Sequence, residues 1–264
     1  MPPTSTSALL LTSFPRPVTA LVAGASRGIG LGFVRRLASG GRVRRVWAGC
    51  RDPEQATALA ELAAGNDAVR LVRLDVTDES SLAAAAAAVG AEHEPLDLVI
   101  NCAGILHRPG GPTPERRLAD VRADWLMEAF AVNGAGPLLL AKHLEPLLPR
   151  RERAVFASLS ARVGSIGDNR LGGWYAYRAS KAAQNMLIRT LSIELARRAR
   201  GAICVALHPG TTDTELSRPF QGGVPESKLF TAERAVEQLL RVIDGLGPGD
   251  NGRFIAWNGE RIPW

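Results

Sequence analysis

Short apolar runs alternate with helical patterns along most of this chain, and that alternation limits the possible folds more than any other feature. The runs are apolar throughout rather than at every second position, which is typical of strands buried on both faces. They occupy residues 18–24, 43–49, 69–76, 96–104, 153–160, 202–210 and 252–257. With helices between them, they predict an α/β fold, a single-domain Rossmann fold with a doubly wound parallel sheet of about seven strands flanked by helices.

The helical patterns between these runs have recognisable ends. Asp52 is a candidate N-cap before Pro53 at the first helical position, and an alanine-rich helix closes at Gly90. Long helical stretches are expected at about 122–147 and from the segment around Tyr177 to about Arg200. The crossovers should be right-handed, which puts ligands at the carboxyl ends of the strands.

The N-terminal segment and the composition bound the cellular context. Residues 1–17 are rich in Ser and Thr and are expected to be a disordered extension before one catalytic domain at 18–264, the alternative being a short targeting segment. No apolar stretch approaches the roughly 18–20 residues of a membrane span, so we expect no membrane partner. Three scattered cysteines (Cys50, Cys102 and Cys204) show no metal spacing and predict a cytoplasmic protein without a metal site.

The net charge of +6 comes from arginines spread along the chain. Its densest runs are "RVRR" at 42–45 and "PRRER" at 149–153, and both flank predicted strands. We interpret them as solvated edges rather than as a nucleic-acid footprint, because interleaved aromatic residues and known motifs are missing. An anionic small ligand is the simpler explanation for any functional arginine.

A glycine-rich turn, "GASRGIG" at 24–30, follows the first predicted strand and opens a helix. In that context the glycines let backbone amides and a helix N-terminus approach a pyrophosphate. Arg27 lies inside this turn, and Arg51 follows the second strand where a free ribose would call for an acid. Two guanidinium groups suit a 2′-phosphate, so the sequence favours NADP(H). The alternative is that Arg51 is a surface residue and Asp52 only a helix cap.

The stretch "WYAYRASK" at 174–181 contains two tyrosines and one lysine. On a helix, Tyr177 and Lys181 lie four residues apart and share a face, whereas Tyr175 lies on another. If a phenol and an ammonium cooperate here, the pair is Tyr177 with Lys181.

In this order and spacing, the motifs identify a family. They are "GASRGIG" (24–30), "LDV" (74–76), "NCAG" (101–104), "VNGAG" (132–136), "YRASK" (177–181) and "HPGTTDT" (208–214). Over residues 18–264 the chain resembles the short-chain dehydrogenases/reductases. The segments before and after Tyr177 and the closing "GRFIAWNGERIPW" resemble the carbonyl-reductase branch that includes the C-factor and sniffer proteins.

The resemblance implies a role for each matching residue. Tyr177 would be the general acid, Lys181 would favour its phenolate and hold the nicotinamide ribose, and Asn133 would support Lys181 through a water from a break in its helix. Asp75 and Val76 would lie by the adenine, although Asp75 could be only a turn residue. The implied cofactor-binding set is Gly24, Ser26, Arg27, Gly28, Ile29, Gly30, Arg51, Asp75, Val76, Asn101, Ala103, Gly104, Tyr177, Lys181, Pro209, Gly210, Thr212 and Thr214.

Three departures from the family pattern stand out. Ala23 replaces a usual threonine, and Cys102 replaces the second asparagine of the "NNAG" pattern. The usual serine pair after the fifth strand becomes "SLSARVGS", so three serines compete for the catalytic position. Of Ser158, Ser160 and Ser165 we choose Ser160, because the strand should end there.

The function implied is reduction of a ketone or aldehyde carbonyl to an alcohol with NADPH, or the reverse, on a small-molecule substrate. Residues 215–230 are expected to form a lid over that substrate, and the two long helices imply a homodimer or homotetramer. The alternative is a cofactor-binding regulatory protein that keeps the fold without turnover; the complete Tyr, Lys and Asn set argues against it.

Overall fold

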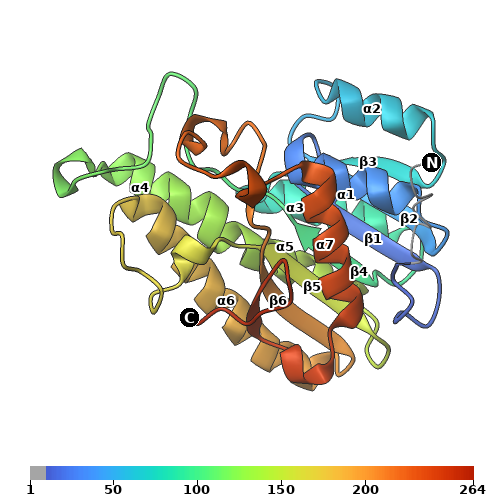
Figure 1. Cartoon of the computed structure of the whole chain (residues 1–264). Helices are drawn as coiled ribbons and strands as arrows, with labels where there is room; N and C mark the ends of the chain where they lie inside the picture. Colours follow the sequence, from blue (N-terminus) through green and yellow to red (C-terminus); the bar gives the residue numbers. More distant parts are fainter. Residues whose placement is uncertain (1–9) are drawn as a thin grey trace, which may run out of the picture.

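The computed structural model of the chain describes residues 10–264, in which seven parallel strands form one sheet with helices on both faces (Figure 1). The strand order is β3-β2-β1-β4-β5-β6-β9. These strands are β1 (Val18–Ala23), β2 (Val43–Cys50), β3 (Val69–Arg73), β4 (Leu98–Asn101), β5 (Ala154–Leu159), β6 (Ala202–His208) and β9 (Arg253–Ala256). The order reverses direction between β1 and β4, so the predicted doubly wound sheet is confirmed.

The helices and the short elements complete the chain. The helices are α1 (Gly28–Ala38), α2 (Thr57–Ala64), α3 (Glu79–Gly90), α4 (Ala123–Ala129), α5 (Gly136–Leu144), α6 (Tyr175–Arg198) and α7 (Ala232–Gly245). A second, two-stranded sheet pairs β7 (Thr211–Thr212) with β8 (Leu229–Phe230). Short 3-10 turns are η1 (Leu118–Asp120), η3 (Glu145–Leu147), η4 (Arg162–Gly164), η5 (Arg218–Phe220), η6 (Glu226–Lys228) and η7 (Pro248–Asp250). No helix within residues 10–264 is long and apolar enough to cross a membrane.

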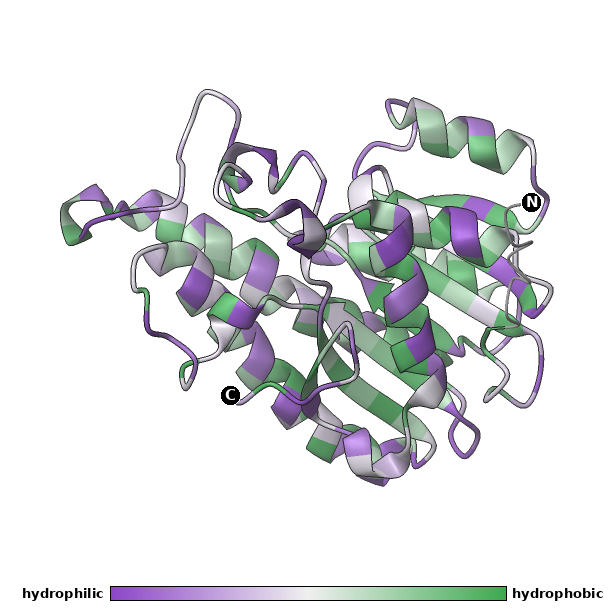
Figure 2. Cartoon of the chain, in the orientation of Figure 1, coloured by the Kyte–Doolittle hydropathy of each residue, from purple (hydrophilic) through white to green (hydrophobic). Residues whose placement is uncertain are grey.

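The apolar strands are explained by the two cores that they separate. On one face the sheet packs against α1, α2 and α7, and on the other against α3, α5 and α6. Every residue of β1 is buried; Val22 belongs to the first core and Leu21 to the second. Figure 2 shows hydrophobic residues concentrated along the central strands. Each such side chain stabilises the fold by about 1.5–3 kcal/mol through burial.

The expected long helix at 122–147 contains a break where the sequence predicts one. Between α4 and α5 the chain forms a π-helical turn, η2 (Phe130–Ala135), with Asn133 buried inside it. Gly136 follows, where a Cβ would come within 2.8 Å of the Val76 side chain, so glycine is required for this close approach. A π-turn inserts one extra residue per turn and redirects the side chains around it.

The prediction for Asp52 is wrong. The helix α2 begins at Thr57, its N-cap position is Ala56, and no side chain caps it. Asp52 instead accepts a hydrogen bond from the Gln55 amide at 3.3 Å, within a separate turn after β2. Ala56 and Leu59 are buried in the core, and their packing sets where the helix begins.

The expected disordered extension does not include residues 10–17. Leu11 and Phe14 are buried, and the Ser13 amide and hydroxyl donate hydrogen bonds to the Asp244 carboxylate near the end of α7 at 2.9 and 2.7 Å. Arg16 forms an ion pair with the buried Asp97 at 2.6 Å. The segment therefore packs against the main domain from Leu10 onward, and residues 1–9 lie outside the described residues.

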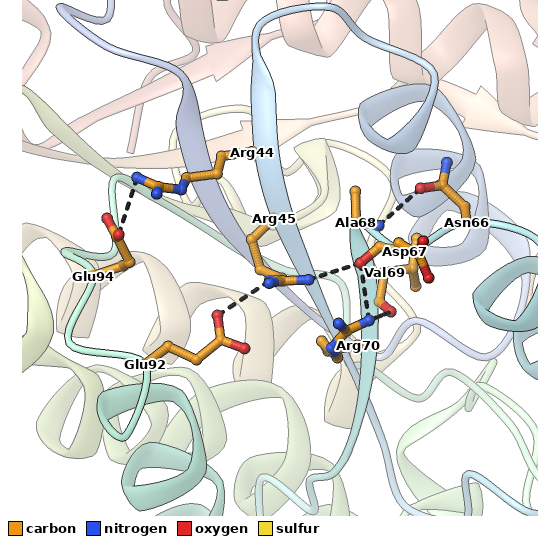
Figure 3. Close-up of polar contacts among 9 residues, drawn as sticks. All are labelled: Arg44, Arg45, Asn66, Asp67, Ala68, Val69, Arg70, Glu92 and Glu94. Carbon is orange, nitrogen blue, oxygen red and sulfur yellow. Dashed lines mark hydrogen bonds and ion pairs between the residues drawn. The ribbon is translucent and has the colours of Figure 1, made fainter.

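The basic run at 42–45 is largely compensated by acidic neighbours and carbonyl groups (Figure 3). The Arg44 guanidinium lies 3.0 Å from the Glu94 carboxylate, and the Arg45 Nε atom 3.1 Å from that of Glu92. Arg45 also donates a hydrogen bond to the Asp67 carbonyl oxygen at 2.7 Å. These contacts reduce the positive field that the run would otherwise present to solvent.

Candidate active site

Most of the predicted site residues line one cavity of about 620 Å³ at the carboxyl ends of the strands. Those that do are Gly24, Ser26, Arg27, Gly28, Ile29, Gly30, Arg51, Asp75, Val76, Ala103, Gly104, Ser160, Tyr177, Lys181, Pro209 and Thr214. Asn101, Asn133, Gly210 and Thr212 do not line it. Asn101 is buried in β4, where its amide donates to Ser158 Oγ at 3.0 Å. These four therefore lie behind the cavity wall or beside it.

The glycine turn leaves a helix N-terminus open toward the cavity. Gly24 has φ +76°, and a Cβ there would lie 2.7 Å from the Ala103 backbone nitrogen. Gly28 has φ +54° and begins α1, which has neither a capping side chain nor an acid in its first turn. The free amides and positive dipole end of α1 therefore favour an anion in the cavity.

Two arginines and one aspartate lie at the end of the cavity next to β2 and β3. Arg27 pairs with Glu215 at 2.5 Å across the cavity mouth. Arg51 is exposed and has no ion-pair partner within residues 10–264. Asp75 accepts hydrogen bonds from the Thr77 amide and hydroxyl at 2.9 and 2.7 Å, so it shapes a turn as well as lining the cavity. This group offers one unpaired cation and one cation that an anionic ligand could take from Glu215.

Tyr177 and Lys181 both line the cavity from α6, whereas Tyr175 is 40% exposed on another face of that helix. The Lys181 ammonium is buried 5.9 Å from the centroid of the Tyr177 ring. It donates hydrogen bonds to the Leu159 carbonyl oxygen at 2.9 Å and to Gln184 Oε1 at 2.8 Å. Since an ammonium has three protons, one remains for a ligand. Gln184 was not predicted as a site residue from the sequence, although it lies three residues after Lys181 on the same helix.

Burial shifts the pKa values of both groups so that their neutral forms are favoured. Desolvation raises the pKa of the Tyr177 phenol above its usual range and lowers the pKa of the Lys181 ammonium to about 7. The protein groups alone therefore raise the pKa of Tyr177, whereas the sequence led us to expect that Lys181 would lower it. A protonated Lys181 would therefore have to lower that pKa to make the phenol a usable acid, and an anionic ligand would contribute only by keeping Lys181 protonated.

Asn133 lies in the π-turn, and its side chain forms three hydrogen bonds to residues outside that turn. Its Oδ1 accepts from the Ile105 amide at 2.8 Å, and its Nδ2 donates to the Ile105 carbonyl oxygen at 2.9 Å and to Ser180 Oγ at 3.0 Å. The carboxamide thus ties the loop after β4 to α6. A Cβ on Gly104 would lie 3.2 Å from Asn133 Oδ1 and 3.6 Å from Lys181 Nζ, so the three residues adjoin.

The three candidate serines have different surroundings. Ser158 is buried and accepts hydrogen bonds from Asn101 and from Gln184, the latter at 2.7 Å. Ser165 is also buried and accepts one from the Asp168 amide at 3.1 Å. Of the three, Ser160 lines the cavity, and its hydroxyl donates to Asn185 Oδ1 at 2.7 Å.

Glu115 supplies the cap that α6 lacks in its own sequence. Trp174, the N-cap residue, makes no side-chain cap bond. The buried Glu115 carboxylate accepts a hydrogen bond from the Ala176 amide at 3.2 Å, and the Glu115 carbonyl oxygen accepts one from the Trp174 amide at 2.6 Å. A carboxylate there also complements the helix dipole. This cap could not be predicted from the sequence, because 61 positions separate the partners.

The residues present suit a dinucleotide with phosphate groups. An open helix N-terminus meets the cavity at its middle, unpaired guanidinium charge lies at one end, and a buried ammonium with a free proton lies at the other. Each of these groups favours an anion or a hydroxyl-bearing ligand. Within residues 10–264 no cluster of His, Cys, Asp and Glu could hold a metal ion.

The model of the short chain dehydrogenase family matches residues 18–223, and the chain belongs to this family. It is 37% identical over 170 residues to the C-signal protein of Myxococcus xanthus, which covers 64% of this chain and 93% of that protein. The crystal structure of NADPH-bound carbonyl reductase from chicken fatty liver matches with a TM-score of 0.83 at 34% identity, covering 94% of this chain and all of that one. Carbonyl reductase Sniffer of Drosophila melanogaster matches with a TM-score of 0.82 at 28% identity, covering 93% and 99%. The chain is thus an oxidoreductase of this family, similar to its carbonyl reductases.

Proposed function

We propose that this oxidoreductase uses NADPH to reduce a ketone or aldehyde carbonyl to an alcohol, or catalyses the reverse reaction. One observation carries the proposal: Tyr177 and Lys181 line the same cavity as the open N-terminus of α1 and the arginines Arg27 and Arg51. A proton donor and a site for a phosphorylated dinucleotide therefore share one space. Similarity to a carbonyl reductase solved with NADPH supports the same conclusion.

The bound nicotinamide would supply the hydride. Tyr177 would donate its phenolic proton to the carbonyl oxygen, and a protonated Lys181 would stabilise the phenolate that remains. Leu159 and Gln184 fix the ammonium, which leaves its third proton for the ribose hydroxyls. Ser160 would orient the carbonyl oxygen with the proton that it gives to Asn185 in this structure. Asn133 would hold the loop after β4 against α6.

The preference for NADPH would come from Arg27 and Arg51. Both line the cavity: Arg27 lies in the turn after β1, and Arg51 directly follows β2, where a free ribose hydroxyl would favour an acid. The 2′-phosphate would take over the charge that Arg27 shares with Glu215. Of the remaining predicted cofactor residues, Thr212 is buried beside the cavity and would act on the ligand only through Thr214 and its neighbours.

The direct test is oxidation of NADPH by the purified protein with a panel of ketones, aldehydes and quinones, with NADH in parallel. We expect turnover of at least one carbonyl class with NADPH and weak turnover with NADH. Binding of NADPH without turnover of any carbonyl, or of any alcohol with NADP⁺, would favour the regulatory alternative instead.

We also propose a homodimer or homotetramer formed through the long helices. Met127 on α4 and Met186 and Ile193 on α6 are 66%, 66% and 47% exposed, which is unusual for large apolar side chains when they recur on adjacent helices. A monomeric mass by light scattering at micromolar concentration would contradict this assembly.

A further inference from the structure

Residues 213–221, which we call the covering segment, extend from the glycine turn to the start of α6. At the first end, a Cβ on Gly28 would lie 3.3 Å from Thr214 Cγ2, so the segment rests on the turn. At the other end, the Phe220 ring packs edge-on against Trp174, the N-cap residue of α6, with centroids 5.3 Å apart. In Figure 1 this orange segment lies beside the green segment after β4. The covering segment therefore connects the two ends of the site.

Hydrogen bonds within this part of the chain hold the covering segment together as one unit. The Arg218 amide donates to the Thr214 carbonyl oxygen at 2.9 Å. The Ser217 hydroxyl donates to the Thr212 carbonyl oxygen at 2.5 Å and accepts a hydrogen bond from Gln221 Nε2 at 2.9 Å. A change at the first residues of the segment is therefore transmitted to its last.

Glu215 ties the covering segment to the rest of the molecule. Within the described residues, the hydrogen bonds and ion pairs from 214–221 to positions outside 210–228 are all made by Glu215. Its carboxylate pairs with Arg27 at 2.5 Å, and its carbonyl oxygen lies 3.3 Å from His107 Nε2. The Arg27 and Glu215 side chains are 68% and 60% exposed, and exposed ion pairs are weak. A stronger anion at Arg27 would therefore displace the carboxylate.

We propose that Glu215 competes with the 2′-phosphate of NADPH for Arg27, and that binding of the phosphate releases the covering segment. The inference rests on the proposed function, because it takes NADPH as the ligand. A phosphate monoester carries about 1.5 to 2 negative charges at pH 7 and three acceptor oxygens, more than a carboxylate offers. A ligand shifts such an equilibrium only through its unequal affinity for the two states. NADPH therefore displaces Glu215, whereas NADH, which lacks the 2′-phosphate, leaves the ion pair intact.

The first test measures binding of adenosine 2′,5′-bisphosphate and of adenosine 5′-monophosphate, which differ only in the 2′-phosphate. Glu215→Gln should lower the dissociation constant for the bisphosphate by about 1.5- to 5-fold, the range expected when an exposed ion pair no longer competes. The constant for the monophosphate should not change. Asp213→Asn is the matched control: Asp213 lines the same cavity but contacts Gln221 rather than Arg27, so both constants should be unchanged.

Hydrogen exchange of the backbone amides of residues 216–221 is a second readout that does not depend on turnover. In the unmodified protein the bisphosphate should make these amides exchange faster, because release frees the segment, and the monophosphate should not. In Glu215→Gln the exchange should be fast without a ligand and should not respond further to the bisphosphate.

Unchanged or weaker binding of the bisphosphate to Glu215→Gln would overturn the competition. Slower exchange of residues 216–221 on bisphosphate binding would also overturn it, since Glu215 would then close over the ligand. Equal tightening in Asp213→Asn would replace the competition with a general charge effect. In each of these cases, a preference of the unmodified protein for the bisphosphate leaves the proposed function standing. Equal dissociation constants of the unmodified protein for the two nucleotides would contradict the NADPH preference and the competition together.

Discussion

The two ends of the cavity are lined by different kinds of secondary structure: strand-end turns at one end, and a helix with two loops at the other. Around Gly24, Gly28 and Arg51 the lining consists of turns that directly follow β1 and β2. Around Tyr177 the lining comes from α6, the loop after β4 and residues between 213 and 218, which are distant from one another in the sequence. One end is fixed by strand termini, and the other by loops that meet only in the folded chain.

This difference explains why the chemistry of the first end can be predicted from the sequence, whereas that of the second end cannot. Strand-end turns need glycine for steric reasons, so they form a short local motif that can be recognised in a single sequence. Loops gather side chains from sites more than 60 residues apart, such as His107 and Trp174. A cofactor class can therefore be predicted from a short stretch, whereas a substrate class requires the fold.

Lys181→Ala should have the largest effect, because Lys181 serves both ends of the cavity. Loss of the ammonium removes the group that stabilises the phenolate, so turnover should fall by about 10²–10⁴-fold. The dissociation constant for NADPH should also rise, since a ligand to the ribose is lost. Steady-state turnover and cofactor titration measure the two effects. A change in only one of them would show that Lys181 belongs to one end alone.

Ser160→Ala should affect only the end where the reaction occurs. A hydroxyl that orients the carbonyl oxygen is worth about 10²-fold in turnover, by comparison with other single donors to a developing charge. NADPH binding should be intact, and Ser158→Ala and Ser165→Ala should remain near normal, because neither serine lines the cavity. A collapse of turnover in Ser165→Ala instead would mean that the catalytic serine has been misplaced.

Arg51→Ala should affect only the cofactor end. A charge-assisted hydrogen bond is worth about 1.5–3 kcal/mol, so the preference for NADPH over NADH should fall by roughly 10- to 100-fold, mainly through weaker NADPH binding. Dissociation constants for both cofactors measure this. Arg44→Ala is a matched control, since that arginine pairs with Glu94 at the amino end of β2, the end opposite Arg51. Equal affinities in the unmodified protein would refute the assignment.

The smallest expected effect is proton uptake on NADPH binding. Burial lowers the pKa of Lys181 to about 7, so at pH 8 the amine is mostly neutral, and nearby phosphates would raise that pKa again. Binding at pH 8 should therefore take up part of a proton, and binding at pH 6 much less. Calorimetry in two buffers of different ionisation enthalpy measures the uptake. Equal uptake at both pH values, or undiminished uptake in Lys181→Met, would exclude Lys181 as its source.

The same contrast decides what could be predicted from the sequence. The strands were predictable because two-sided burial leaves continuous apolar runs, and the break at Asn133 because two glycines follow it. The start of α2 was not, since the burial of Ala56 overrides the local capping signal at Asp52. Gln184 and Glu115 were missed because their roles depend on partners that are distant in the sequence: Gln184 bonds Ser158, and Glu115 bonds the Ala176 amide.

The central claim is that one phenol in this cavity donates the proton, and the comparison of Tyr177→Phe with Tyr175→Phe tests it most directly. Both changes remove one hydroxyl and keep the ring, so folding and NADPH binding should survive in each. Steady-state turnover with NADPH and a carbonyl substrate should drop by at least about 10²-fold in Tyr177→Phe and by no more than about 3-fold in Tyr175→Phe. Full activity in Tyr177→Phe, or an inactive Tyr175→Phe, would contradict the account.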